Sequence, residues 1–385
     1  MKKFLLFCTL AAMSAMSLTL LSSCTPADQG SMNIGIIAPT TGGAATFGIA
    51  SSNGSILAFE EINERGGILG MQVNSILLDD EHTPAVSISM FQRLVHQDNV
   101  VGIVGPVTSG PANAVGAAAE AGGDRIPMIA PTATHADVTS HGDFIFRACF
   151  LDAFQAYNMA NFAFNNLGAR TAAILFDSGM AYSEGLAVNF RTYFEALGGE
   201  IVANEAYITG AVDFRTQLTT IRATDADVLF LPDYFPVIAL MAAQVRELGV
   251  TSTLLGADGW EGIFEVVADP SILDGAFFSA HFAADYPSPV VANFVASYTE
   301  RFGTPPNSFA ALGFDAAGIL AQAIEEAGST DNEAIINAMQ NIRFNGVTGP
   351  IYFNYRGDPI KELMVIAIED TGEETIARLY YRFIP

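Results

Sequence analysis

Short apolar runs alternate with longer segments of mixed polarity along nearly the whole chain. In the first part, the runs that predict buried strands are residues 33–38, 73–78, 100–104 and 128–130. Between them, apolar positions recur three and four residues apart, which predicts helices at 54–65 and 86–96 and a third from about Ser109.

The same alternation resumes after residue 150. Strands are expected at 171–176, 201–207, 228–231, 253–255 and 276–279. Helices are expected at 154–167, 183–197, 214–222, 237–248, 290–302, 310–327 and 333–340. The last apolar runs, at 350–353, 364–369 and 376–382, read as strands. Continuous apolar strands separated by helices are typical of parallel sheets covered on both faces, so the fold class is α/β.

Because this pattern occurs twice, we expect two lobes, each built around its own sheet. The break near Arg147–Asp152 is a plausible crossing point between lobes, and others fall near His281–Pro287 and Gly346–Pro350, where the composition turns to Gly, Pro and Asp. The expected division is residues 32–148 plus 283–348 for the first lobe and 149–282 plus 349–385 for the second. In open parallel sheets, ligands bind beyond the carboxyl ends of the strands.

The first residues carry the features of an export signal. Lys2 and Lys3 precede an apolar run that ends in Leu21-Ser22-Ser23-Cys24, which is similar to a bacterial lipobox. We expect residues 1–23 to be a lipoprotein signal peptide, Cys24 to carry the lipid and 24–31 to form a tether. An ordinary signal peptide with an incidental Cys, or an uncleaved anchor, are the alternatives. The expected location is extracytoplasmic and membrane-anchored, in a periplasm or on an outer cell surface.

Charge and cysteine content exclude some classes of partner. The chain has 41 Asp and Glu against 17 Lys and Arg, a net charge of −24 at pH 7. Such a surface repels phosphate backbones, so nucleic-acid binding is not expected. With Cys8 in the signal and Cys24 lipidated, Cys149 is alone, which leaves no internal disulfide and no cysteine-based metal site.

Motifs for catalysis are missing from the turns after the strands. The sequence has no Gly-x-Gly-x-x-Gly, no Gly-x-x-x-x-Gly-Lys and no Gly-x-Ser-x-Gly in such a place. The five His residues show no metal-ligand spacing. We therefore expect no enzyme, and the sequence implies no catalytic residue, cofactor or metal.

Small hydroxyl residues follow two neighbouring predicted strands instead. Gly105–Pro111 contains Thr108 and Ser109, and Pro131–Thr134 contains Thr132. A hydroxyl residue at a strand-to-helix turn can cap the helix, and the same turn exposes backbone N–H groups that suit a carboxylate. Helix capping alone and ligand binding both remain open for these residues.

Several segments together resemble the branched-chain amino-acid-binding proteins, the leucine/isoleucine/valine-type solute receptors of ABC importers. The resemblance rests on Ile34–Gly48, Ala58–Gly67, Leu78–Glu81, Phe146–Arg147, Tyr182–Gly185, Asp213–Phe214 and Leu255–Gly259. It implies the type I periplasmic binding protein fold, with two doubly wound parallel-sheet lobes, three crossover segments and a ligand in the cleft between the lobes.

The resemblance also implies ligand contacts at Phe47, Ser109, Thr132, Thr134, Tyr182, Tyr234 and Asp258. Ser109 falls where the family binds the ligand α-carboxylate, and Thr134 where a hydroxyl and an amide hold the head group. Thr132 falls where a backbone carbonyl receives the ammonium. Asp258 falls where a carboxylate pairs with that ammonium, and the three aromatic residues match positions that line the pocket.

Some assignments stay open at this point. Asp258 could be a plain turn residue, and Asp233 could meet the ammonium in its place. Trp260 could be a cleft wall or core. The family's best-known members have a disulfide that reaches the carboxylate loop, where this chain has Thr108. Asp258 is also one methylene shorter than the glutamate often found there.

The expected function is that of a lipid-anchored receptor that delivers a branched-chain or other apolar amino acid to an ABC importer. Its partners would be the small ligand and the permease subunits, and the receptor would be a monomer that closes by hinge motion around the ligand. The alternatives are a ligand-sensing receptor domain, or a receptor for an amide, urea or a small carboxylate.

Overall fold

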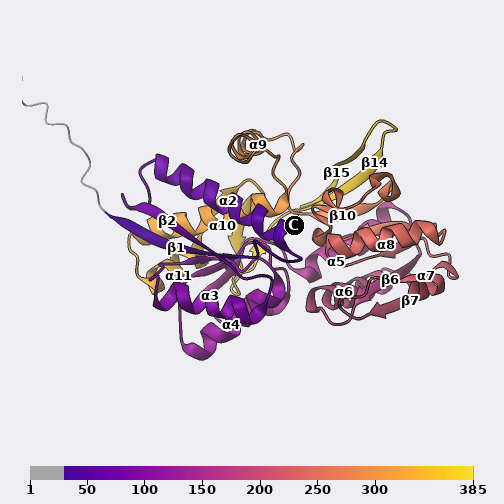
Figure 1. Ribbon diagram of the computed structural model, residues 1–385, viewed down its shortest axis with the longest axis horizontal. Coiled ribbons are helices and arrows are strands. Elements are labelled where there is room, and N and C mark those ends of the chain that lie inside the picture. Colours follow the sequence, from indigo (N-terminus) through magenta and orange to yellow (C-terminus); the bar gives the residue numbers. More distant parts are fainter. Residues whose placement is uncertain (1–29, 385) are drawn as a thin grey trace, which may run out of the picture.

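A computed structural model describes residues 30–384 of the chain and shows two α/β lobes side by side (Figure 1). The expected signal peptide, Cys24 and most of the expected tether lie outside the described residues. The first lobe contains a parallel sheet with the order β2-β1-β3-β4-β5. Its strands are β1 (Ser31–Ala38), β2 (Gln72–Asp79), β3 (Ile103–Val104), β4 (Met128–Ala130) and β5 (Ile145–Arg147).

The second lobe contains a seven-stranded sheet with the order β15-β14-β10-β9-β8-β6-β7. Its strands are β6 (Thr171–Asp177), β7 (Glu200–Tyr207), β8 (Val228–Phe230), β9 (Thr253–Gly256), β10 (Phe277–Ala280), β14 (Leu363–Asp370) and β15 (Thr375–Phe383). The strands up to β10 are parallel, and β14 and β15 add an antiparallel edge.

Helices cover both sheets (Figure 1). Those of the first lobe are α2 (Ala45–Glu64), α3 (Pro84–His96), α4 (Ser109–Gly122), α10 (Ser308–Ala327) and α11 (Asn332–Asn341). Those of the second are α5 (Asp152–Asn161), α6 (Ala181–Ala196), α7 (Arg215–Arg222) and α8 (Phe235–Glu247), while α9 (Pro289–Phe302) packs against α2. Within residues 30–384, no helix is long and apolar enough to span a membrane.

Helices α2 and α10 pack unusually closely because glycines stand where they meet. A Cβ on Gly54 would lie 1.9 Å from the carbonyl oxygen of Ala310, and one on Gly313 would lie 2.0 Å from that of Ser51. The Ser55 hydroxyl donates to the Gly313 carbonyl at 3.0 Å. This pairing fixes the relative positions of Phe47 near the start of α2 and Phe309 at the start of α10.

The chain passes between the two sheets three times. The passages are residues 148–151 after β5, residues 281–288 after β10, and residues 361–362 before β14. Two contacts join them: the Phe150 ring stacks on His281 with 3.6 Å between centroids, and the Lys361 ammonium donates to the Ala148 carbonyl at 3.1 Å.

The Gly- and Pro-rich segment Gly346–Pro350, a suggested crossing point, is instead the turn between two antiparallel strands, β11 (Phe344–Gly346) and β12 (Gly349–Phe353). With β13 (Pro359–Ile360) they form a small third sheet. The same turn composition serves a hairpin and a passage equally well, because both need residues that reverse the chain.

The alternation of strands and helices agrees with the expectation at almost every element. Helix α2 begins at Ala45, well before the expected residue 54, because its first turns carry small residues that show no apolar periodicity. The expected helix 154–167 is α5 followed by a π-helical segment, Phe162–Asn166. Strands β5, β11 and β13 were not expected, since two or three residues carry too little pattern.

Candidate functional site

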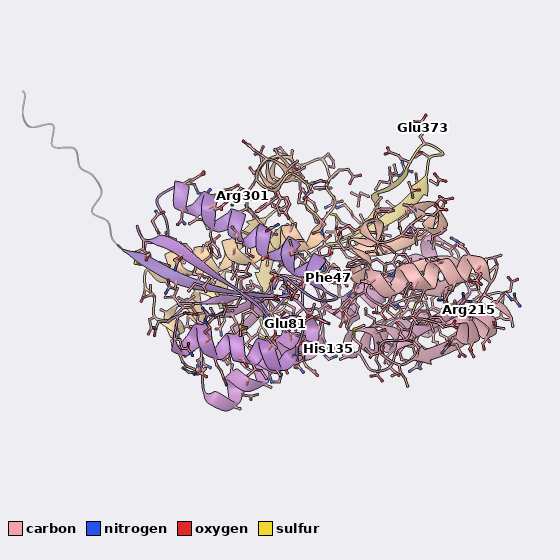
Figure 2. All side chains as sticks on the ribbon, viewed as in Figure 1. Phe47, Glu81, His135, Arg215, Arg301 and Glu373 are labelled. Carbon is pink, nitrogen blue, oxygen red and sulfur yellow. The ribbon has the colours of Figure 1, made fainter. Side chains whose placement is uncertain are left out.

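A small cavity lies where the two lobes meet, at the carboxyl ends of their strands. Its free volume is about 10 Å³, close to the least that holds one water molecule, so the lining side chains nearly fill it. Its lining residues are Phe47, Val107, Thr108, Ser109, Thr132, Thr134, Tyr182, Tyr234, Asp258, Gly259 and Phe309. All seven residues expected to contact a ligand are therefore brought together here, and Figure 2 shows Phe47 at the junction of the lobes.

The first lobe contributes hydroxyl groups and the start of a helix. Ser109 is the first residue of α4, so its amide and that of Gly110 belong to the turn whose N–H groups have no acceptor within the helix. The Ser109 hydroxyl accepts the amide of His135 at 3.3 Å. Thr132 and Thr134 follow β4, and the Thr132 hydroxyl donates to the Val107 carbonyl. This side of the cavity is rich in hydrogen-bond donors and lies at the positive end of a helix dipole.

The second lobe contributes a buried carboxylate held by three donors. Asp258 follows β9 and is 3% exposed. Its Oδ1 accepts from the Tyr182 hydroxyl at 2.7 Å and from the Gln155 amide at 3.0 Å. Its Oδ2 lies 3.1 Å from Nε2 of His281. An ionised carboxylate offers about four acceptor sites, so room remains for one further donor from a ligand.

His281 therefore connects the site to a passage between the lobes. It is completely buried, and burial lowers its pKa to about 4 even though the hydrogen bond to Asp258 acts in the opposite direction. The imidazole is thus neutral at pH 7, with the proton on Nε2 donated to Asp258. Its Nδ1 has no partner among the described residues.

Aromatic rings close the rest of the cavity. Phe47 stacks on Phe309 with 4.2 Å between centroids and meets the edge of Tyr234 at 5.3 Å. Tyr234 in turn stacks on Tyr182 at 4.9 Å. Phe47 belongs to the first lobe and the two tyrosines to the second, so these contacts join the lobes. They form the apolar part of the cavity lining.

A second buried carboxylate near Asp258 was not expected from the sequence. Asp152, the first residue of α5, shares the Gln155 amide with Asp258 at 3.1 Å. Burial and the nearby Asp258 charge raise its pKa to about 7. Its Oδ2 has no partner among the described residues. The only sequence signal was its place at a predicted crossing point, because nothing local marks an Asp at the start of a helix as part of a cleft.

Phe309, Val107 and Gly259 also line the cavity without having been expected. Gly259 is required there, since a Cβ would lie 2.8 Å from the Tyr182 hydroxyl and from the Asp233 carbonyl. Phe309 is separated from the other site residues by a long stretch of sequence, so only the pairing of α10 with α2 brings it in.

Asp233 and Trp260, whose roles the sequence left open, are not among the residues that line the cavity. Asp233 does not line the cavity; it accepts the Tyr207 hydroxyl and the Tyr234 amide, and burial raises its pKa to about 7. Trp260 is fully buried, and its indole N–H donates to the Leu231 carbonyl at 2.9 Å, so it belongs to the core. Of the two carboxylates weighed for the cleft, Asp258 is the one that lines it.

The cavity thus has opposed polarity along its length. Hydroxyl groups and helix amides of the first lobe stand at one end, and the carboxylate of Asp258 stands at the other. Residues 31–373 match the sequence pattern of a family described as "Periplasmic binding protein". This chain belongs to the periplasmic binding protein family. Membership places it outside the cytoplasm, as a substrate-binding protein and not an enzyme.

Particular members of the periplasmic binding protein family resemble the chain over most of its length. It is 33% identical to the Leu/Ile/Val-binding protein BraC3 of Rhizobium johnstonii over 82% of this chain and 85% of that protein. The crystal structure of the leucine-binding protein LivK from Thermotoga maritima has a TM-score of 0.85 and 33% identity, covering 92% of this chain and 99% of that chain. LivJ of Streptococcus pneumoniae, solved in complex with isoleucine, has a TM-score of 0.84 and 29% identity, covering 91% and 99%.

Proposed function

We propose that this protein is a receptor for branched-chain amino acids. The observation that carries the proposal is the opposed polarity of the cavity, with Ser109 and Thr134 at one end and Asp258 at the other. A zwitterion requires donors for its carboxylate and a carboxylate for its ammonium, and both lie here on facing lobes. The relatives described as leucine- or Leu/Ile/Val-binding point to the same ligand class.

We infer the residue roles from the family resemblance, and their common place around the cavity supports them. The Ser109 hydroxyl and the first amides of α4 bind the ligand carboxylate, and Thr134 holds the head group from the same lobe. The ammonium lies between the Thr132 carbonyl and Asp258. Phe47, Tyr182 and Tyr234, which line the cavity, surround the aliphatic side chain.

Delivery to an ABC importer is the second part of the proposal. Ligand bound between lobes that meet through aromatic contacts stabilises their closed arrangement, and a permease can distinguish that arrangement from an open one. Lipidation at Cys24 would hold a monomeric receptor beside its permease.

The ligand class is tested by thermal unfolding with single amino acids. A ligand present at 100 times its dissociation constant stabilises a protein by about 2.7 kcal/mol, which is easily seen as a shift in melting temperature. Leucine, isoleucine and valine should raise the melting temperature, whereas benzoate, urea and acetamide should not. If one of the latter compounds stabilises the protein and the three amino acids do not, the branched-chain assignment is wrong.

The anchor is tested separately with Cys24→Ser in a bacterial host. The unaltered protein should sediment with membranes, and the variant should be released in soluble form. Membrane attachment that persists in the variant would contradict lipidation at Cys24. Leucine binding by the purified protein is independent of that outcome.

A further inference from the structure

His82 lies behind the hydroxyl-rich end of the cavity. It follows β2 in the turn before α3, is partly buried, and has a left-handed backbone with a φ of 55°. Its Nδ1 lies 2.9 Å from the hydroxyl oxygen of Thr108, which lines the cavity directly before Ser109. Figure 2 shows the neighbouring Glu81 near the junction of the two lobes.

The hydroxyl of Thr108 is directed to His82 and not to the helix that it precedes. Thr108 is the N-cap residue of α4, yet its side chain makes no capping hydrogen bond. A threonine at this position normally accepts an amide of the first turn, which stabilises a helix by about 1 kcal/mol. Here the amides of the first turn are left for another acceptor, and the hydroxyl links His82 to the cavity.

The direction of the hydrogen bond between His82 and Thr108 decides whether the Thr108 hydroxyl can donate a hydrogen bond to a ligand in the cavity. If Nδ1 carries no proton, the Thr108 hydroxyl must donate to it and can only accept from the cavity side. If Nδ1 carries a proton, it donates to the Thr108 oxygen, and the hydroxyl proton is free to point into the cavity. Only the second arrangement offers a donor to a carboxylate.

His82 is also in contact with the opposite lobe. Its ring lies 6.1 Å from the ring of Tyr234 in an edge-on arrangement, with an interplanar angle of 73°. Tyr234 precedes α8 and lines the cavity. The imidazole therefore joins the turn after β2, the loop before α4 and the second lobe.

We propose that His82 is a positioning residue for the carboxylate end of the site, which holds the Thr108 hydroxyl as a donor to the carboxylate of a bound amino acid. This inference rests on the proposed function, because it assigns the ligand carboxylate to the α4 end. His82 itself does not touch the ligand.

The charges around His82 act on its protonation. Asp79, Asp80 and Glu81 precede it in its own segment, Thr108 faces it from the loop before α4, and the phenol of Tyr234 faces it from the second lobe. Burial lowers the pKa of His82, and the charge of Asp80 acts in the opposite direction. Ligand binding therefore selects the form of the ring in which Nδ1 carries the proton.

The test is a double-mutant cycle measured by leucine titration calorimetry on the full mature protein. His82→Gly removes the imidazole and tolerates the left-handed backbone, Thr108→Val removes the hydroxyl but keeps the shape, and His82→Asn places an amide donor near Nδ1. His82→Gly and Thr108→Val should each weaken leucine binding about tenfold. The double variant should be no weaker than Thr108→Val alone, and His82→Asn should restore most of the affinity.

A structural role without the hydrogen bond gives different results. Equal affinity of His82→Gly and the unaltered protein, or a further loss in the double variant, would overturn the inference. If the unaltered protein does not bind leucine at all, it is the proposed function that fails.

Discussion

The Tyr182 hydroxyl donates to Oδ1 of Asp258 at 2.7 Å and accepts the amide of Gly259 at 2.9 Å. Both residues lie in the second lobe, one at the start of α6 and the other after β9. This double role fixes the plane of the carboxylate before any ligand arrives. Burial, together with the charge of Asp258, raises the pKa of Tyr182 well above its usual value, so the phenol keeps its proton at all working pH values.

Asp258→Asn should remove the partner of the ligand ammonium with little change of shape. Loss of a charged, buried partner costs about 3 kcal/mol, so leucine affinity should fall at least about 100-fold in titration calorimetry. Asp233→Asn is the matched control, because Asp233 is buried nearby but does not line the cavity. Undiminished binding by Asp258→Asn would remove this residue from the site.

Tyr182→Phe should weaken binding less. The ring and its stacking on Tyr234 remain, and only one of the three donors to Asp258 is lost. A single hydrogen bond of this kind is worth roughly 1 kcal/mol, so an affinity loss of about fivefold to tenfold is expected. A loss as large as that of Asp258→Asn would mean that the hydroxyl contacts the ligand itself.

Asp152 should make the stability of the ligand-free protein depend on pH. Its pKa is about 7 in the folded protein and about 3.9 when unfolded, so between these values the folded state binds more protons. The contribution of Asp152 to the free energy of unfolding is fully present below about pH 4 and is lost as pH rises through 7. From pH 6 to 8 it should lower the free energy of unfolding by about 1 kcal/mol. Asp152→Asn should make the free energy of unfolding, measured with urea, depend less steeply on pH. The part of the pH dependence that comes from Asp233 should remain. An unchanged pH dependence would contradict the raised pKa of Asp152.

Gly313→Ala should destabilise the protein by forcing α2 and α10 apart. The added Cβ would lie 2.0 Å from the Ser51 carbonyl, and overpacking of this kind costs about 1–3 kcal/mol. Gly110→Ala is the control, since a Cβ on this glycine, also within a helix, meets nothing within 4 Å. Thermal unfolding should separate the two variants, and equal melting temperatures would show that the helix contact is not as close as described.

Most of the fold could be predicted because apolar runs and helical periodicity are local properties. The strands that line up in the two sheets are continuous apolar segments, and nearly all of them were recognised. The short strands β5, β11 and β13 and the early start of α2 were missed. Two or three residues carry little pattern, and small residues such as those of Ala45–Ser52 do not show which side of a helix is buried.

The candidate site could be predicted only where the family resemblance identified a residue by its position in the sequence. The resemblance to the branched-chain amino-acid-binding proteins pointed to Ser109, Thr134 and Asp258 by position, and all three line the cavity. Asp152 and His82 act through contacts with residues far away in sequence. Such contacts depend on how helices and turns pack, and no local spacing encodes them.

The central claim is that a dipolar amino acid spans the cavity from the α4 end to Asp258. The most direct measurement compares leucine, leucinamide and 4-methylpentanoate by titration calorimetry with the unaltered protein. Leucine should bind, and each analogue, which lacks one of the two charges, should bind at least about 100-fold more weakly. Binding of 4-methylpentanoate with the affinity of leucine would show that Asp258 does not pair with an ammonium group and would contradict the account.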